Sequence, residues 1–192
     1  EEVPFLESSE QTLRVVSAAI ETKFSALQQA TLKKNIKQTL SILRKIDALP
    51  GQMSIAEATS LFLGCYPFHP VTAILLPMLC QKVAQNERTL FSYLGSHDIK
   101  SVNDSIMPSD VYDYFITNQS ASIGDHITHR RWVEVVTAIE RLGDANSDEV
   151  SLLKTIGLMN IVGSRSGFKP SKLLLSSLGL SKTRFRTALK ML

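Results

Sequence analysis

Apolar residues recur every three or four positions through the first quarter of the chain, which is the spacing of an amphipathic helix. Between Glu10 and Leu49 the series runs Leu13, Val16, Ile20, Phe24 and Leu27, then Leu32, Ile36, Leu40 and Leu43. This pattern predicts either one long helix or a helical hairpin broken near Ala30. Pro50 and Gly51 end the pattern.

Capping signals divide the next part of the chain. Ser54 and Glu57 have the spacing of a capping box, in which each side chain satisfies a free backbone N–H of the other residue, so a helix should follow to about Gly64. Pro70 suits the first turn of another helix, whereas Pro77 should kink or split that helix because it removes an interior hydrogen bond.

Similar signals predict six further helices. Asn86 should cap a helix from Glu87 to Gly95, and Ser109 should cap residues 110–116. Three more are expected at 126–142, at 148–161 and after Pro170, and Ser181 should begin the last one. Because no segment shows the alternation of a strand, the predicted fold class is all-α.

Composition narrows the setting of the protein. The chain has 192 residues, 44% of them hydrophobic, enough for one or two domains with a packed core. No apolar run approaches the roughly 20 residues of a membrane span, so we expect no membrane partner and a cytoplasmic location. Cys65 and Cys80 both lie in apolar segments, which favours buried core cysteines over a disulfide or a nucleophile.

The charge is distributed unevenly along the chain. Residues 150–192 carry eight Lys or Arg and no Asp or Glu, whereas residues 1–149 carry 13 basic and 18 acidic residues. Such asymmetry favours an anionic partner for the basic end, although a solvated basic face would look the same. None of the nine glycines belongs to a GxxxxGK[ST] phosphate loop, and neither catalytic motifs nor metal-ligand spacings occur.

Several segments resemble large bacterial P-loop ATPases of the AAA-like or STAND-like kind, some of them associated with anti-phage defence islands. The segments are YPFHPVTAILLPMLCQKVAQNERTLFSYL, MPSDVYDYF, RRWVEVVTAIERL and LLKTIGLMNIVGSRSGFKPSKLLL, so the resemblance covers roughly residues 60 to 190. It implies a helical lid over residues 1–145 and a winged-helix-like, helix-turn-helix domain over residues 146–192. That domain is expected to be incomplete at its C-terminal end.

The resemblance also implies a nucleotide site shared with a P-loop core that this sequence lacks. ATP with Mg²⁺ would bind the intact protein, and the chain alone should neither bind it tightly nor hydrolyse it. Arg88, in the first turn of a helix, fits a cation that stabilises phosphate charge. Gln85 or Asn86 would position phosphates or water, and Glu87 would hold Arg88. The alternative is that Asn86 only caps the helix and that Glu87 and Arg88 form surface ion pairs, which contribute little stability. His69 is either a further phosphate contact or simply a helix cap.

The basic C-terminal segment suggests a second contact. Lys182, Arg184, Arg186 and Lys190 follow a glycine turn, as cations do on a recognition helix that contacts DNA or RNA. Winged helices of STAND-like ATPases can instead pack on the nucleotide core and act as a switch.

The sequence therefore predicts part of an ATP-binding protein that couples nucleotide state to a nucleic acid, a second copy of itself or a defence-system partner. The alternatives are a non-enzymatic DNA-binding or regulatory module and a structural scaffold.

Overall fold

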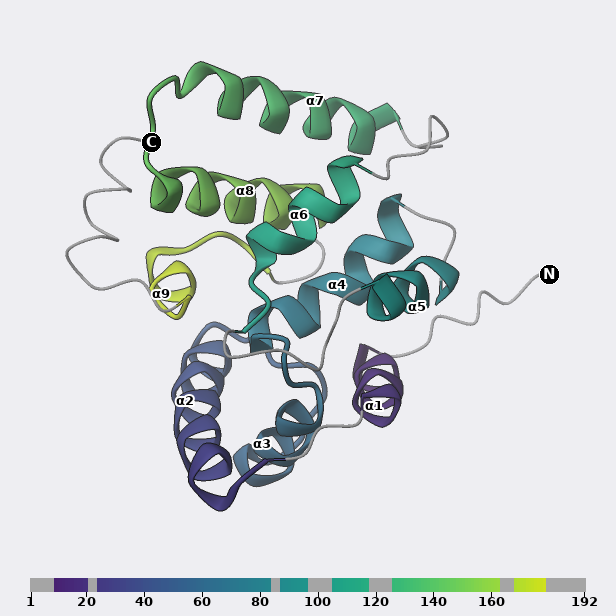
Figure 1. The fold of residues 1–192 in the computed structure, drawn as a ribbon, viewed down its shortest axis with the longest axis vertical. Coiled ribbons are helices and arrows are strands. Elements are labelled where there is room, and N and C mark those ends of the chain that lie inside the picture. The colour runs from purple at the N-terminus through teal and green to yellow at the C-terminus, as the bar shows by residue number, and fades with distance from the viewer. Residues whose placement is uncertain are drawn as a thin grey trace.

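The computed structural model describes residues 9–20, 24–83, 87–96, 105–117, 126–162 and 168–178. The described part is all-α, and its only extended pairing is one parallel bridge between Phe68 and Ile106. The helices are α1 (Ser9–Ala19), α2 (Ala26–Lys45), α3 (Ile55–Gly64), α4 (Pro70–Val83), α5 (Glu87–Ser96), α6 (Pro108–Thr117), α7 (His126–Arg141), α8 (Ser147–Val162) and α9 (Lys172–Leu175) (Figure 1).

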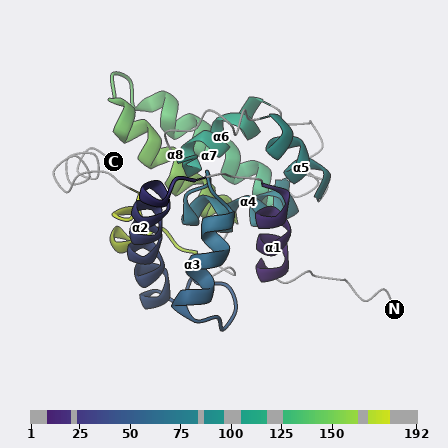
Figure 2. The same ribbon diagram turned by 60° about the horizontal axis from the view of Figure 1, so that its bottom comes forward.

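Helix α4 occupies the centre of the fold. It lies against α1, α2, α5, α6 and α8, with α1 to α3 below it in Figure 1 and α6 to α8 above it. Turning the molecule shows α3 between α2 and α1 (Figure 2). The sequence explains this position, because α4 is apolar around most of its circumference, as expected of a helix covered on all sides. It continues through Pro77 without being split.

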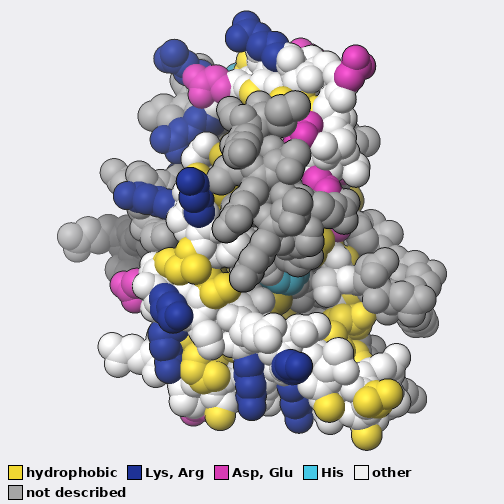
Figure 3. Space-filling view, turned by 90° about the vertical axis from the view of Figure 1, so that its left-hand side faces the viewer, with side chains coloured by type: hydrophobic (Ala, Val, Ile, Leu, Met, Phe, Trp, Pro, Cys, Tyr) yellow, Lys and Arg dark blue, Asp and Glu magenta, His cyan; other side chains and the backbone are white. Residues whose placement is uncertain are grey.

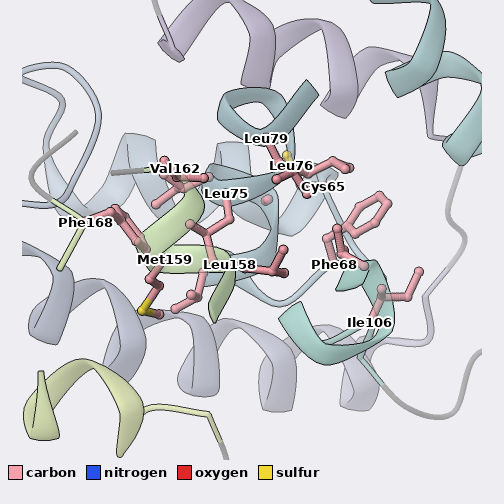
Figure 4. Packing of buried hydrophobic residues seen from close by; sticks show 14 of the residues in the cluster. Cys65, Phe68, Leu75, Leu76, Leu79, Ile106, Leu158, Met159, Val162 and Phe168 are labelled. Carbon is pink, nitrogen blue, oxygen red and sulfur yellow. The ribbon is translucent and has the colours of Figure 1, made fainter. Parts of the chain in front are cut away.

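One hydrophobic cluster runs through the described residues. Leu75 of α4 lies beside Leu158 of α8, and Phe68, just before α4, lies near Ile106, just before α6 (Figure 4). The core therefore continues across the predicted boundary between residues 145 and 146. That boundary stays a prediction, as does the winged-helix form of the last part, much of which lies outside the described residues.

The predicted break near Ala30 is wrong, because Ala30 lies inside α2. The chain is interrupted earlier, where Ser25 caps α2 by accepting a hydrogen bond from the Gln28 N–H. The Gln28 side chain in turn accepts from the Ser25 N–H at 3.0 Å. This capping box makes Ser25 a strong helix start. Helix α1 then packs on α3 and α4 instead of forming a hairpin with α2.

The cap predicted at Ser109 is also wrong. Pro108 is the first residue of α6, and the Asp110 carboxylate accepts a hydrogen bond of 2.7 Å from the Met107 N–H. Ser109 is buried within the first turn. Proline is favoured at this first position because its ring already has the helical φ.

Other predicted helix ends are confirmed. Ser54 and Glu57 form the capping box of α3, and α5 begins at Glu87. Ser171 caps α9 by accepting a hydrogen bond from the Leu174 N–H. Helix α8 begins just before the predicted residue 148, because the Asn146 side chain accepts hydrogen bonds from the N–H groups of Asp148 and Glu149. Local side-chain chemistry thus determines most of the helix starts.

Close packing joins α7 to α8 and α6. Trp132 of α7 is buried and stacks on Tyr112 of α6 with 5.4 Å between ring centroids. At Gly157 of α8, a Cβ atom would collide with the side chain of Val135 of α7. A glycine in a helix interior costs stability, so its place here is explained by the close approach of the two helices.

We expect Gly157→Ala to lower the free energy of unfolding by about 1–3 kcal/mol, because overpacking outweighs the gain in helix propensity. Gly95→Ala is the matched control, since a Cβ at Gly95 in α5 meets no atom within 4 Å. That substitution should stabilise the protein by about 0.5–1 kcal/mol. Urea unfolding measures both effects. In the double variant, adding Val135→Ala to Gly157→Ala should recover stability, because it removes the side chain with which the new Cβ collides. A stabilising Gly157→Ala would contradict this account of the packing.

Candidate functional site

The segment Tyr66–Pro70, here called the YPFHP turn, joins α3 to α4. Its Tyr66–Pro67 peptide bond is cis. The turn pairs with residue 106, because the His69 N–H donates to the Ile106 carbonyl at 3.1 Å and the Ile106 N–H donates to the Pro67 carbonyl at 2.9 Å. Thr72 Oγ1, fully buried in the first turn of α4, donates to the same Ile106 carbonyl at 2.8 Å. The start of α4 is thereby fixed to the segment that precedes α6.

Ring contacts extend the turn to other parts of the chain. Tyr66 lies edge-on to Phe24, just before α2, with 5.2 Å between ring centroids. Phe68 packs against Tyr93 of α5 at 6.1 Å. Cys65, immediately before the turn, directs its Sγ to the Leu13 carbonyl of α1 at 3.6 Å. Aromatic pairs of this kind add stability beyond their buried area. The turn therefore joins the start of α2 to α4 and α5, and Cys65 beside it adds a contact with α1.

His69 caps α4. Its Nδ1 accepts a hydrogen bond from the Val71 N–H at 3.3 Å, and its carbonyl accepts from the Ala73 N–H at 2.9 Å. Burial lowers the pKa of His69 to about 4, although a hydrogen bond to the backbone of Ser177 acts in the opposite direction. A hydrogen-bond acceptor stabilises the protonated imidazole and so raises its pKa. The bond therefore runs from an imidazole N–H to the Ser177 carbonyl.

His69 has two predicted roles, a helix cap and a phosphate contact. The imidazole is neutral near pH 7 and is engaged by Val71 and by the backbone of Ser177. A phosphate contact would require the ring to give up one of these partners. The capping role is therefore confirmed by the geometry, and a nucleotide contact stays a prediction that the geometry does not favour.

The other predicted nucleotide contacts surround the start of α5. Gln85 and Asn86 lie outside the described residues. For Glu87 and Arg88 the structure describes the backbone, which places both in the first turn of α5, but not the side chains. The predicted nucleic-acid contacts Lys182, Arg184, Arg186 and Lys190 also lie outside the described residues. These assignments stay predictions.

A groove of about 580 Å³ lies between α7, α8 and the segment before α9. Its lining combines apolar residues with Arg131, Glu134, Asn160 and Lys169. Arg131 donates a hydrogen bond to the Asn160 carbonyl at 2.6 Å, which holds its guanidinium along the wall. The sequence analysis missed this groove, because only packing shows which faces of α7 and α8 leave space between them. Among the residues that line the groove, only Gly157 gave a sequence signal, because a glycine inside a helix suggests the close approach of another element.

The sequence analysis also missed a basic surface on α2. Lys33, Lys34, Lys37 and Lys45 are exposed there, and α2 contains no acidic residue. A signal was present in the sequence, but counting charges over residues 1–149 concealed it because acidic residues elsewhere outnumber these cations.

Comparisons of the chain with protein-family models, curated proteins and solved structures gave no match. None of the described helices has both the length and the apolar content to cross a bilayer. Within the same described residues, no group of three His, Cys, Asp or Glu side chains is placed to hold a metal ion.

His69 should make stability depend on pH. Its folded pKa of about 4 lies below the ordinary value of 6.5, so between these values the unfolded chain binds a proton that the folded chain does not. The free energy of unfolding should therefore fall by about 2 kcal/mol as pH drops from 6.5 to 4, allowing for partial exposure. His69→Asn keeps a capping acceptor and should remove this part of the pH dependence.

The control is His129→Asn, which changes an exposed residue of α7. Chemical denaturation at several pH values compares both variants with the parent. A His69→Asn profile that parallels the parent's from pH 6.5 to 4 would show that His69 is not the titrating group.

Both cysteines should be inert in the folded protein. Burial raises the pKa of Cys65 and of Cys80 to about 12, and neither forms a disulfide. Because the thiolate is the reactive species, a thiol-reactive dye should label the native chain at least about a hundredfold more slowly than the urea-unfolded chain. Cys65→Ser and Cys80→Ser separate the two sites. Rapid labelling of either thiol in the native chain would contradict its burial.

Proposed function

We propose that this chain is the helical lid and C-terminal part of a larger P-loop ATPase, and that it couples nucleotide state to a nucleic acid or protein partner. The resemblance around Tyr66–Leu94 motivates the proposal. The observation that carries it is the position of the YPFHP turn, which hydrogen-bonds through His69 to Ile106 and to the backbone of Ser177. Through Phe68 the same turn contacts Tyr93 of α5, so the helix that carries Arg88 is linked through the turn to the C-terminal part.

Coupling between two sites can be carried by packed side chains and rigid helices that lie between them. Helix α4 supplies one, because it begins at the YPFHP turn, packs on α8 and is followed by α5. A phosphate at the first turn of α5 would be attracted by free backbone N–H groups and by Arg88. A shift of α5 would act on the turn through the contact between Tyr93 and Phe68. The turn would pass the displacement to α9 through Ser177.

In this proposal the chain does not carry out hydrolysis alone. A P-loop core of the same protein would hold ATP and Mg²⁺, and Arg88 would stabilise the negative charge that develops on the phosphates. The gene provides an inexpensive test. A GxxxxGK[ST] segment encoded upstream of Glu1 would support the proposal, whereas a natural start codon adjacent to Glu1 would contradict it.

In the intact protein, Arg88→Ala should reduce the rate of ATP hydrolysis by about tenfold or more, as expected on removal of a cation that stabilises phosphate charge. The matched control is Arg14→Ala, because Arg14 is an exposed arginine of α1 that pairs with Glu10 at 2.8 Å. Steady-state turnover and the affinity for ATP are measured for both variants. Turnover equal to that of the Arg14 control would remove Arg88 from the nucleotide site.

A further inference from the structure

Helix α2 carries an unbalanced positive charge. Its 20 residues, ALQQATLKKNIKQTLSILRK, include five Lys or Arg and no Asp or Glu. The opposite side of the helix is buried through Ile36, Thr39, Leu40 and Leu43. The core thus fixes the orientation of the helix, and the cations are held on its exposed side.

Most of these cations have no acidic partner. Arg44 donates a hydrogen bond to the Met53 carbonyl at 2.9 Å, so it is engaged within the fold. Lys33, Lys34, Lys37 and Lys45 are exposed, and none of them forms an ion pair with a carboxylate of the described residues. By contrast, Lys154 of α8 pairs with Asp113 at 2.6 Å. The four unpaired lysines leave a net positive potential over this helix.

The positive surface continues beyond α2. Helix α9 contacts α2. Lys169, just before α9, and Lys172, its first residue, are both exposed. Lys and Arg side chains recur along this face of the molecule, where acidic side chains are fewer (Figure 3). We call the six residues together the α2–α9 basic face: Lys33, Lys34, Lys37, Lys45, Lys169 and Lys172.

We propose that the α2–α9 basic face binds the phosphate backbone of double-stranded nucleic acid. With a rise of 1.5 Å per residue, Lys33 to Lys45 extends over about 18 Å, which matches roughly five base pairs of a duplex. Unpaired surface lysines suit phosphates well, because binding releases condensed counterions without the cost of breaking an existing ion pair. The contact would depend on charge and not on base sequence.

The composition of the face argues against other anionic partners. Lysine is depleted in protein–protein interfaces, where aromatic residues usually supply the affinity, and this face presents no exposed aromatic side chain among the described residues. A helix lying on a membrane would need its apolar side free. The apolar side of α2 is buried in the core instead.

This inference is independent of the proposed ATPase role and of the predicted contacts at Lys182, Arg184, Arg186 and Lys190. It needs neither nucleotide nor a P-loop, so it is tested with the 192-residue chain alone. Failure of DNA binding here would leave the Arg88 experiment unaffected. Failure of the Arg88 experiment would likewise leave this inference unaffected.

The test is fluorescence anisotropy with a labelled 20-base-pair DNA duplex over a range of salt concentrations. The triple variant Lys33→Gln, Lys34→Gln and Lys37→Gln should bind at least about tenfold more weakly near 0.1 M salt. It should also lose about two to three units from the slope of log affinity against log salt, roughly 0.9 per lost phosphate contact. Circular dichroism and thermal unfolding check that the variant remains folded.

The matched control removes the same charge elsewhere, with Arg14→Gln, Lys82→Gln and Arg130→Gln on α1, α4 and α7. Its affinity and salt slope should stay close to those of the parent. Equal losses in the two triple variants would reduce the effect to net charge and overturn the proposal. Unchanged binding by the α2 variant, or equally tight binding of polyglutamate or of anionic lipid vesicles, would overturn it as well.

Discussion

The carbonyl of Ile106 is the acceptor on which the arrangement of the helices depends. It receives hydrogen bonds from the His69 N–H and from Thr72 Oγ1, which uses both lone pairs of one oxygen. These bonds are shielded from water, where an unsatisfied partner would cost about 1–3 kcal/mol. They fix the direction in which α4 leaves the YPFHP turn. Because α4 contacts five other helices, that direction determines where those helices can pack.

Local signals in the sequence predicted the helices well and their packing poorly. Caps such as Ser54 act within one turn of helix, so neighbouring residues are enough to find them. Pro108 and Asp110 provide an equally local signal, and it was missed because Ser109 looked like the more usual cap. The bond from His69 to Ser177 differs in kind, since it joins residues far apart in the chain and no short motif encodes it. A capping role for His69 was therefore predictable, and its second partner was not.

Electrostatics shows the same division between local and spatial information. The acidic excess of residues 1–149 conceals the local basic excess of α2, and the structure adds that the lysines of α2 lie on its exposed side. Folding then brings Lys169 and Lys172 from the basic end of the chain next to α2. Charges that are distant in sequence become one surface because α9 packs on α2. The charge counted over a long region bears on solubility and on non-specific attraction to oppositely charged partners, but it does not locate a binding face.

The YPFHP turn also places two parts of the chain that follow it. Tyr93 is held against Phe68 on one side of residues 97–104, and Ile106 is hydrogen-bonded to His69 and Pro67 on the other. The two ends of that connection are therefore set by contacts with the same turn. The placement of α5 and of the segment before α6 is thus encoded in one short turn. A substitution in the YPFHP turn would therefore disturb both neighbours together, whereas a substitution in α5 would leave Ile106 attached.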